Sequence, residues 1–327
     1  MRDQTWDIVK GIGILLVIIN HIMGFPIISM FHMPLFFIAS GYFAKPNRDK
    51  SFFCWKNFKS LIIPYLKWGF LITLIYFLLD KEEGLLYLKD VLLGISFDNN
   101  YGISFGPLWF LLSLFWCKCI YNILSKHIIN NYILVISILL SWGVQILSQY
   151  CNIKIIPYFI TTSFPALFFY SMGVFWKTHI DVTKFKQNHI IWLILAIISI
   201  SWYQLKTPRL NYSFSKLTFF PFCLINGFLY TLLLYWVVSK LQLIHNKIIN
   251  RGGQFLEFCG HNSMDMFLFH SVEFAFIIGG LRNSLEVVIH SSIIIALINI
   301  IINTAFAILY VYTKRILFSA IKKSTKA

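Results

Sequence analysis

The chain has 327 residues, of which 58% are hydrophobic and only 13% charged, and its formal net charge is +15. Soluble globular domains carry about 25% charged residues, so this composition excludes a soluble protein and predicts an integral membrane protein. Apolar windows long enough to cross a bilayer recur from end to end. Because no long polar stretch separates them, we expect a single membrane domain over residues 1–327.

The hydrophobic pattern predicts an all-α polytopic bundle of about ten membrane spans. We place these spans at residues 8–24, 32–44, 60–80, 107–125, 130–149, 156–176, 188–205, 216–238, 262–281 and 288–313. With the N-terminus inside, most basic residues fall in the inner loops, so both termini are expected to be cytoplasmic. Topology and anionic lipid headgroups then account for the positive charge, and no nucleic-acid partner is predicted.

The first apolar segment is expected to remain as a membrane helix rather than to be cleaved as a signal peptide. Asp3 and Asp7 lie in its leading region, and no small-x-small cleavage site follows the apolar run. The loop between the third and fourth spans is acidic, and its middle, residues 84–95, is apolar enough to lie along the membrane interface as a short helix. The six cysteines are scattered through or beside apolar segments, so we expect core-filling side chains and no metal site.

One lysine and one histidine on the first span are the first functional candidates. Lys10 and His21 are eleven residues apart, so on a helix they share one face about 16 Å apart along the axis. Ionisable groups inside an apolar helix are expensive to keep, and those that persist are usually functional. The stripe that joins them is therefore expected to face the interior of the bundle.

Four further motifs follow in order along the chain. They are Phe31-His32-Met33-Pro34 with Phe36, Phe37, Ser40 and Gly41 after it; Leu61-Ile62-Ile63-Pro64-Tyr65; Pro107-Leu108-Trp109-Phe110-Leu111; and Gly260-His261-Asn262-Ser263 before a span that contains His270. Together with the basic residue, ten residues and His21 of the first helix, this ordered set resembles integral-membrane acyltransferase family three, especially its short fucose-O-acetylase-like members. The resemblance covers the whole chain.

The resemblance implies acyl-coenzyme A as the donor, a sugar hydroxyl as the acceptor, and His21 as the essential residue. Many family members carry Arg where this chain has Lys10. A lysine contacts phosphate as a point charge and lacks the bidentate fork of arginine, so donor contacts at this position are expected to be less directed.

The residues allow a mechanism compatible with this resemblance. The basic residues Lys45, Arg48, Lys50, Lys56 and Lys59 are expected to attract the negatively charged nucleotide end of the donor, with Lys10 at the entrance. The pantetheine arm would then extend along the stripe toward His21. This histidine acts either as the general base for the acceptor hydroxyl or as an acyl acceptor, and the sequence leaves both routes open.

Three other polar or aromatic positions are assigned to the substrate, and one acidic position to His21. If a helix begins near Asn262 at the inner interface, Glu273 lies at about the depth of His21 and is expected to orient it. His32, Trp109 and His270 are candidate substrate contacts. The alternatives are structural: His32 caps a hairpin, Trp109 packs at the interface, Glu273 pairs with another polar residue, and Lys10 extends to the interface.

These features predict an enzyme of the cell inner membrane that moves an acyl group, most often acetyl, from acetyl-coenzyme A to a hydroxyl of a cell-surface polysaccharide or its lipid-linked precursor. The main rival is a transporter or flippase, because a bundle with a central polar stripe also suits a translocation path. Against it, the sequence has no evident inverted repeat. A non-catalytic helper of glycan assembly is a third interpretation.

Overall fold

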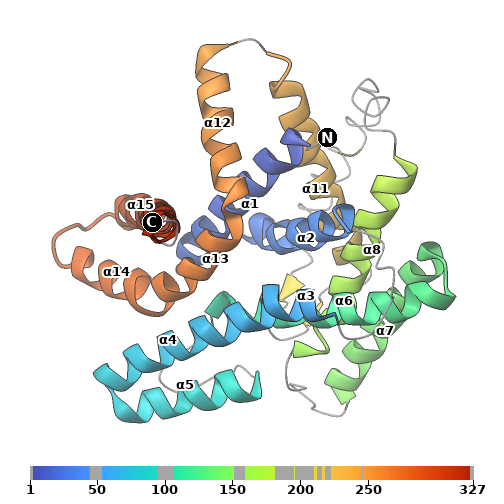
Figure 1. Ribbon diagram of the computed structural model, residues 1–327, viewed down its shortest axis with the longest axis horizontal. Helices are drawn as coiled ribbons and strands as arrows, with labels where there is room; N and C mark the ends of the chain where they lie inside the picture. The colour runs from blue at the N-terminus through green and yellow to red at the C-terminus, as the bar shows by residue number, and fades with distance from the viewer. Residues whose placement is uncertain are drawn as a thin grey trace.

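The computed structural model describes residues 3–44, 54–94, 106–150, 159–180, 195, 210–211, 216–217, 222–244 and 246–324. Over these residues the protein is a helical bundle, and its strands form one two-residue antiparallel ladder (Figure 1). The elements, where η marks a short 3-10 or π helix, are α1 (Gln4–Met23), α2 (Pro26–Tyr42), α3 (Trp55–Asn57), η1 (Phe58–Ile62), α4 (Ile63–Leu79), α5 (Lys81–Leu93), η2 (Gly106–Leu108), α6 (Trp109–His127), α7 (Asn130–Tyr150), α8 (Ser163–His179), β1 (Leu210–Asn211), β2 (Lys216–Leu217), α11 (Phe222–Leu241), α12 (Lys247–His261), α13 (Ser263–Val272), η5 (Glu273–Ile277), α14 (Ile278–Glu286) and α15 (Ser292–Ser324).

Six helical stretches of the described chain are long and apolar enough to cross a membrane, and the bent pair Ser263–Ile277 and Gly280–Glu286 would be a seventh. The prediction of a multi-span helical bundle is therefore confirmed. The number of about ten spans and the cytoplasmic position of both termini stay predictions. The predicted span at 188–205 lies outside the described residues except for residue 195.

Helices α1 and α2 form the hairpin on which the site is built. The Asp3 carboxylate caps the start of α1 by accepting from the backbone N–H of Thr5 and Trp6, and Gly24 ends it with a φ of 66°. Pro26 then opens α2 at a position where no helical N–H is needed. The second span thus begins at residue 26 and not at the predicted 32, since Pro34 is tolerated inside the helix.

Glycines let the central helices pack backbone to backbone. A methyl group added at Gly11 of α1 would collide with the Leu256 carbonyl of α12, and one at Gly260 would collide with the Asp7 carbonyl. A similar close crossing joins α2 to α8 through Gly41 and Gly173. Small residues at such crossings are the usual means by which membrane helices approach closely. These contacts fix α1 and α2 against their neighbours.

Helix α5 corresponds to the interfacial helix predicted near residues 84–95. It starts at Lys81, where the Asp80 side chain caps it by accepting from the N–H of Glu82 and Glu83. It folds back along α4, as Figure 1 shows, and the Tyr65 hydroxyl of α4 donates to the Val91 carbonyl at 2.6 Å. The segment is therefore helical as predicted, but it lies against α4 and begins three residues earlier.

Candidate active site

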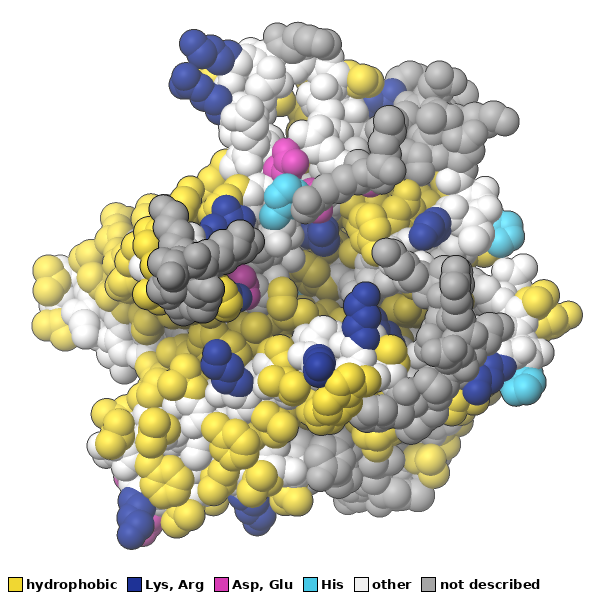
Figure 2. Space-filling view, viewed as in Figure 1, with side chains coloured by type: hydrophobic (Ala, Val, Ile, Leu, Met, Phe, Trp, Pro, Cys, Tyr) yellow, Lys and Arg dark blue, Asp and Glu magenta, His cyan; other side chains and the backbone are white. Residues whose placement is uncertain are grey.

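Five helices and the α3 segment line a cavity of about 610 Å³. Its lining residues are Lys10 of α1; Phe36, Ala39 and Ser40 of α2 with Phe43 and Ala44 after it; Cys54, Lys56 and Asn57; Phe110, Leu114, Lys118 and Asn122 of α6; Tyr170 of α8; and Ser263, Met264 and Phe267 of α13. On the face drawn in Figure 2 the molecule is hollowed near its centre, with apolar side chains inside and Lys and Arg side chains around the hollow. The cavity thus combines apolar walls with several cations.

Three lysines line this cavity. Lys10 also pairs with the Asp7 carboxylate at 2.8 Å, whereas Lys56 and Lys118 reach the cavity from α3 and α6. Lys59, predicted to share this role, is not among the lining residues. Its ammonium lies over the Trp55 ring, 5.4 Å from the ring centroid. Lys45 and Arg48 lie outside the described residues.

Three side chains form a hydrogen-bonded row beyond the cavity. The His21 Nδ1 is 2.7 Å from the His270 Nε2, and the His270 Nδ1 is 3.1 Å from a Glu273 carboxylate oxygen. The two imidazole rings are nearly coplanar, 9° apart with centroids separated by 5.0 Å. Because facing nitrogens at 2.7 Å are closer than stacked ring planes can be, the bond lies in the plane of both rings.

With Glu273 ionised, the row leaves the lone pair of His21 on one particular nitrogen. An ionised Glu273 accepts only, so the His270 Nδ1 donates to it and the His270 Nε2 is an acceptor. His21 then donates its Nδ1–H to that nitrogen, which leaves the His21 Nε2 unprotonated. The His270 and Glu273 side chains are fully buried, whereas His21 is only partly buried. The arrangement has the logic of a base oriented by a second group, extended by one histidine.

Local backbone features place this row. Helix α13 passes into the π-helical turn η5 at Glu273, a feature that is frequent at functional sites. The Phe274 ring packs against His21, with centroids 4.9 Å apart. Gly106 also lies close to the Phe274 ring, and its φ of 70° makes the corner before Pro107 and Leu108. The Pro-Leu-Trp motif therefore closes one side of the histidine site.

His32 lies near the same row from α2. Its side chain is buried and its Nδ1 donates to the Ile28 carbonyl at 2.7 Å, which leaves the Nε2 as an acceptor. His32 is close enough to His21 for charges on the two rings to interact. It precedes Phe36, Ala39 and Phe43, which line the cavity, by about one, two and three helical turns. His32 is thus buried within the bundle and continues a cavity-lining face.

Trp109 begins α6 directly after the Gly106 corner. It is half-buried and packs against the hydrophobic core, 6.3 Å from both the Phe110 and the Phe159 ring centroids. Its neighbour Phe110 is one of the α6 residues that line the cavity. The contacts of Trp109 are those of a packing residue, and its predicted substrate contact stays a prediction.

A second polar cluster lies at the N-terminal half of α1. Asp7 accepts from Lys10 and, at 3.0 Å, pairs with His261, whose ring is also 3.6 Å from Glu257. Ligand atoms of Asp7, Glu257 and His261 lie within 4.8 Å of one another, as metal ligands do. However, Lys10 holds one oxygen of Asp7 and the Gln4 amide donates to Glu257 at 2.9 Å. The cluster is therefore an ion-pair network that holds Lys10 at the cavity and joins α1 to α12.

The structure brings three of the predicted site residues into one row. Glu273 was expected to orient His21, and in the structure His270 lies between them. His270 was expected to contact substrate; both of its ring nitrogens are engaged within the row, and the substrate contact stays a prediction. Asn262 directly precedes α13, and its side chain bonds the Phe258 carbonyl and the Arg315 guanidinium.

The sequence prediction gave no role to Lys118. Its signal was available, because it is a basic residue within a predicted apolar span, a placement that usually marks function. The polar neighbours Asn57 and Asn122 in the cavity lining had no such signal. Their position depends on how α3 and α6 pack, which no local pattern encodes.

Comparison with known families agrees with this geometry. A family model described as an acyltransferase domain matches residues 3–312, nearly the whole chain. The chain belongs to integral-membrane acyltransferase family three. The family match includes every residue of the cavity lining and of the histidine row. No solved structure matches this family-three chain.

A relative with a curated description is also similar in sequence. The chain is 31% identical over 160 residues to the nodulation protein NolL of Sinorhizobium fredii (strain NBRC 101917 / NGR234). The match covers 42% of this chain and 42% of NolL, so it spans less than half the length of that relative.

Proposed function

We propose that this family-three acyltransferase moves an acyl group, most often acetyl, from acyl-coenzyme A to a sugar hydroxyl of a cell-surface polysaccharide or its lipid-linked precursor at the cell inner membrane. One observation carries the proposal. The faces of α1, α2 and α13 that line the lysine cavity continue directly to His21, His32 and His270. A ligand held by its charges in the cavity can therefore present its far end to the histidine row.

The cavity suits the nucleotide end of the donor. Small-molecule sites typically have about 300–1,000 Å³, and this one has about 610 Å³ with Lys10, Lys56 and Lys118 on its walls. Phosphate groups form strong charge-assisted hydrogen bonds with lysine. The distance of about 16 Å from Lys10 to His21 along α1 is one that an extended pantetheine arm can span.

The His21 Nε2 is the base in the direct route. It takes the proton from the acceptor hydroxyl while the hydroxyl oxygen attacks the thioester carbon, and the carbon–sulfur bond then breaks. The departing coenzyme A thiolate takes the proton back from His21, so the enzyme ends unchanged. In the second route the same Nε2 attacks the thioester carbon, and the carbon–sulfur bond breaks to release the coenzyme A thiolate. The acceptor hydroxyl oxygen then attacks the acyl-histidine carbon, the bond to Nε2 breaks, and the hydroxyl proton passes to the thiolate.

His270 and Glu273 act as positioning residues in either route. Their hydrogen bonds hold the His21 ring with its free nitrogen directed away from His270. The Glu273 carboxylate also stabilises the positive charge that develops on the paired imidazoles. His32 offers a second acceptor nitrogen, which would hold the sugar hydroxyl by a hydrogen bond.

The sugar acceptor rests on two supports. The motifs of the chain resemble the fucose-O-acetylase-like members of family three, and the partial relative is named for nodulation.

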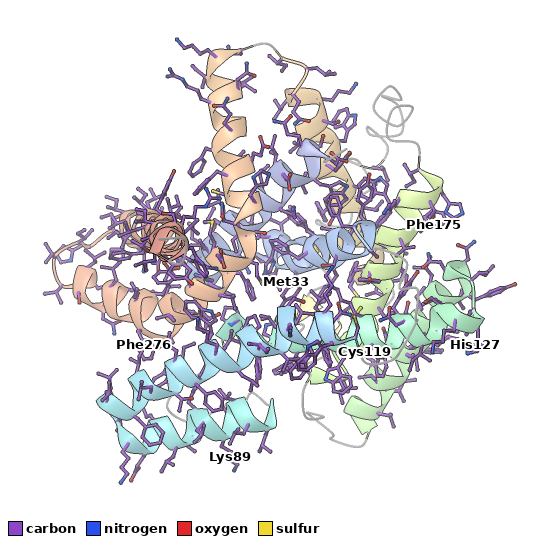
Figure 3. The ribbon with its side chains drawn as sticks, in the orientation of Figure 1. Met33, Lys89, Cys119, His127, Phe175 and Phe276 are labelled. Atoms are coloured by element: carbon purple, nitrogen blue, oxygen red, sulfur yellow. The ribbon has the colours of Figure 1, made fainter. Side chains whose placement is uncertain are left out.

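Substitution of His21 tests the proposal. Purified protein with acetyl-coenzyme A and a membrane glycan fraction should release free coenzyme A, and His21→Ala should abolish this release because no other nitrogen of the row has a free lone pair. His127→Ala is the matched control, since His127 lies at the far end of α6, away from the site (Figure 3). A folded His21→Ala protein that still acylates the glycan at the normal rate would contradict the assignment.

A further inference from the structure

The histidine row has an aromatic neighbour, Phe274, that also adjoins the corner before α6. The Phe274 ring lies against His21, with centroids 4.9 Å apart and planes at 55°. Gly106 lies close to the same ring, since a methyl group added there would be 3.4 Å from Phe274 Cδ1, an ordinary van der Waals distance. Phe274 therefore contacts the base and adjoins the corner that precedes α6.

Neighbouring contacts keep this ring from turning away. Phe274 sits in the π-helical turn η5, directly after Glu273, which is tied to His270. Two residues on, Phe276 packs on Tyr76 of α4 at 4.6 Å, and the Tyr76 hydroxyl is 3.5 Å from the Ala275 carbonyl. The turn that carries Phe274 is thus tied to neighbouring helices by residues on both sides of Phe274.

Acyl transfer requires the thioester carbon close to His21. Reacting atoms must approach to about 3–3.5 Å, so the carbon chain of the acyl group has to lie beside the His21 ring. The cavity leads to this point along faces bearing Phe36, Phe110 and Phe267. Phe274 stands on the side away from the lysines, where the end of a longer acyl chain would have to go.

We propose that Phe274 sets the length of acyl group that the enzyme accepts, with its ring closing the acyl site behind a group of acetyl size. The inference rests on the proposed acyltransferase function and deepens it, because it assigns a specificity-determining residue. The ring rejects longer chains by contact, because it occupies the space beside His21 that their additional carbon atoms would need.

Removal of the ring should change the preference among donors. In Phe274→Ala, kcat/KM for hexanoyl-coenzyme A relative to acetyl-coenzyme A should rise about 10- to 100-fold, the range by which apolar pockets discriminate small differences in size. Phe274→Leu should give an intermediate ratio. The ratio is the readout because a loss of support for His21 lowers both rates together and cancels.

Phe276→Ala is the matched control. Phe276 is the same residue type in the same turn, but it packs on Tyr76 and lies toward α4 (Figure 3). It should leave the ratio between the two donors unchanged. Equal shifts in Phe274→Ala and Phe276→Ala would overturn the proposal, because general loosening of η5 would then explain the effect.

A binding measurement separates this proposal from the proposed function. Purified wild-type protein should bind S-ethyl-coenzyme A at least 10-fold more tightly than S-hexyl-coenzyme A, and Phe274→Ala should remove most of this difference. If neither thioether binds, the acyl-coenzyme A assignment fails. If both bind equally to the wild-type protein, or transfer occurs with an unchanged chain preference in Phe274→Ala, the role of Phe274 alone is refuted.

Discussion

His270 joins His21 and Glu273 into one hydrogen-bonded row. A direct contact between Glu273 and His21 would have put a carboxylate beside the base. With His270 between them, the carboxylate is two hydrogen bonds away and His21 is kept as a donor on one nitrogen and an acceptor on the other. The residue types and their depth follow from the sequence, but their order depends on the π-helical turn at Glu273, which no spacing rule reveals.

Loss of the Glu273 charge should slow the chemistry more than it weakens donor binding. Glu273→Gln keeps the shape and an acceptor for the His270 Nδ1–H but removes the carboxylate, so kcat should fall about 10²- to 10⁴-fold, as in other base–orienter pairs. KM for acyl-coenzyme A should change little, because the lysine cavity is intact. Steady-state kinetics of coenzyme A release measure both values.

Glu286→Gln serves as the control, since Glu286 forms an exposed pair with Arg282 on α14. Partial recovery in Glu273→Asp would support the role of the charge. A purely structural role would be indicated if Glu273→Gln lowered the unfolding temperature and left kcat of the remaining folded protein unchanged.

Close helix crossings govern the structure at the scale of elements. The apolar pattern predicted the helices well, because long hydrophobic segments are a strong signal. It did not predict which helices pair. Nothing in the sequence distinguishes Gly11 and Gly260 from other glycines, and only the structure shows the backbones that approach them. The displaced start of α2 has a similar cause, because Pro26 and Pro34 each suggest a boundary and only one of them is used.

The α12 glycines allow a direct test of this crossing. Gly260→Ala should destabilise the protein by about 1–3 kcal/mol, the usual cost of overpacking, because its new methyl group would meet the Asp7 carbonyl. Gly252→Ala is the control in the same helix, where nothing lies within 4 Å. It should be neutral or stabilising by about 0.5–1 kcal/mol. Thermal unfolding in detergent compares them, and equal unfolding temperatures would argue against the close crossing.

The positive charge of the whole molecule has a local use at the cavity. The sequence predicted a basic inner side from its net charge of +15, but it did not separate the lysines that enter the cavity from those that remain outside. That selection follows from the packing of α1, α3 and α6. The number of spans was harder still, because one predicted span falls outside the described residues and α2 is a helix of only 17 residues.

The effect of a lysine substitution on KM should therefore depend on whether the lysine lines the cavity, and not on the lost charge alone. Lys118→Gln should raise KM for acetyl-coenzyme A about 10-fold or more, since hydrogen bonds to charged groups contribute about 1.5–3 kcal/mol. Lys59→Gln removes the same charge outside the cavity lining and should change KM less than about 2-fold. High salt should remove this small effect of Lys59→Gln, because it screens charges exposed to solvent. Kinetics at low and high ionic strength test this, and equal effects of both substitutions would contradict it.

The interlocked glycines of α1 and α12 also bear on how substrates travel. Because each helix lacks room even for a methyl group at the crossing, α1 cannot slide or roll against α12 without breaking their contact. His21 therefore lies on a helix, α1, whose position against α12 is fixed. If the proposed function holds, an acyl group that moves from the cavity toward His21 passes side chains such as Phe36, Phe110 and Phe267, and we expect rotamer changes of these rings, rather than rocking of helices, to admit it.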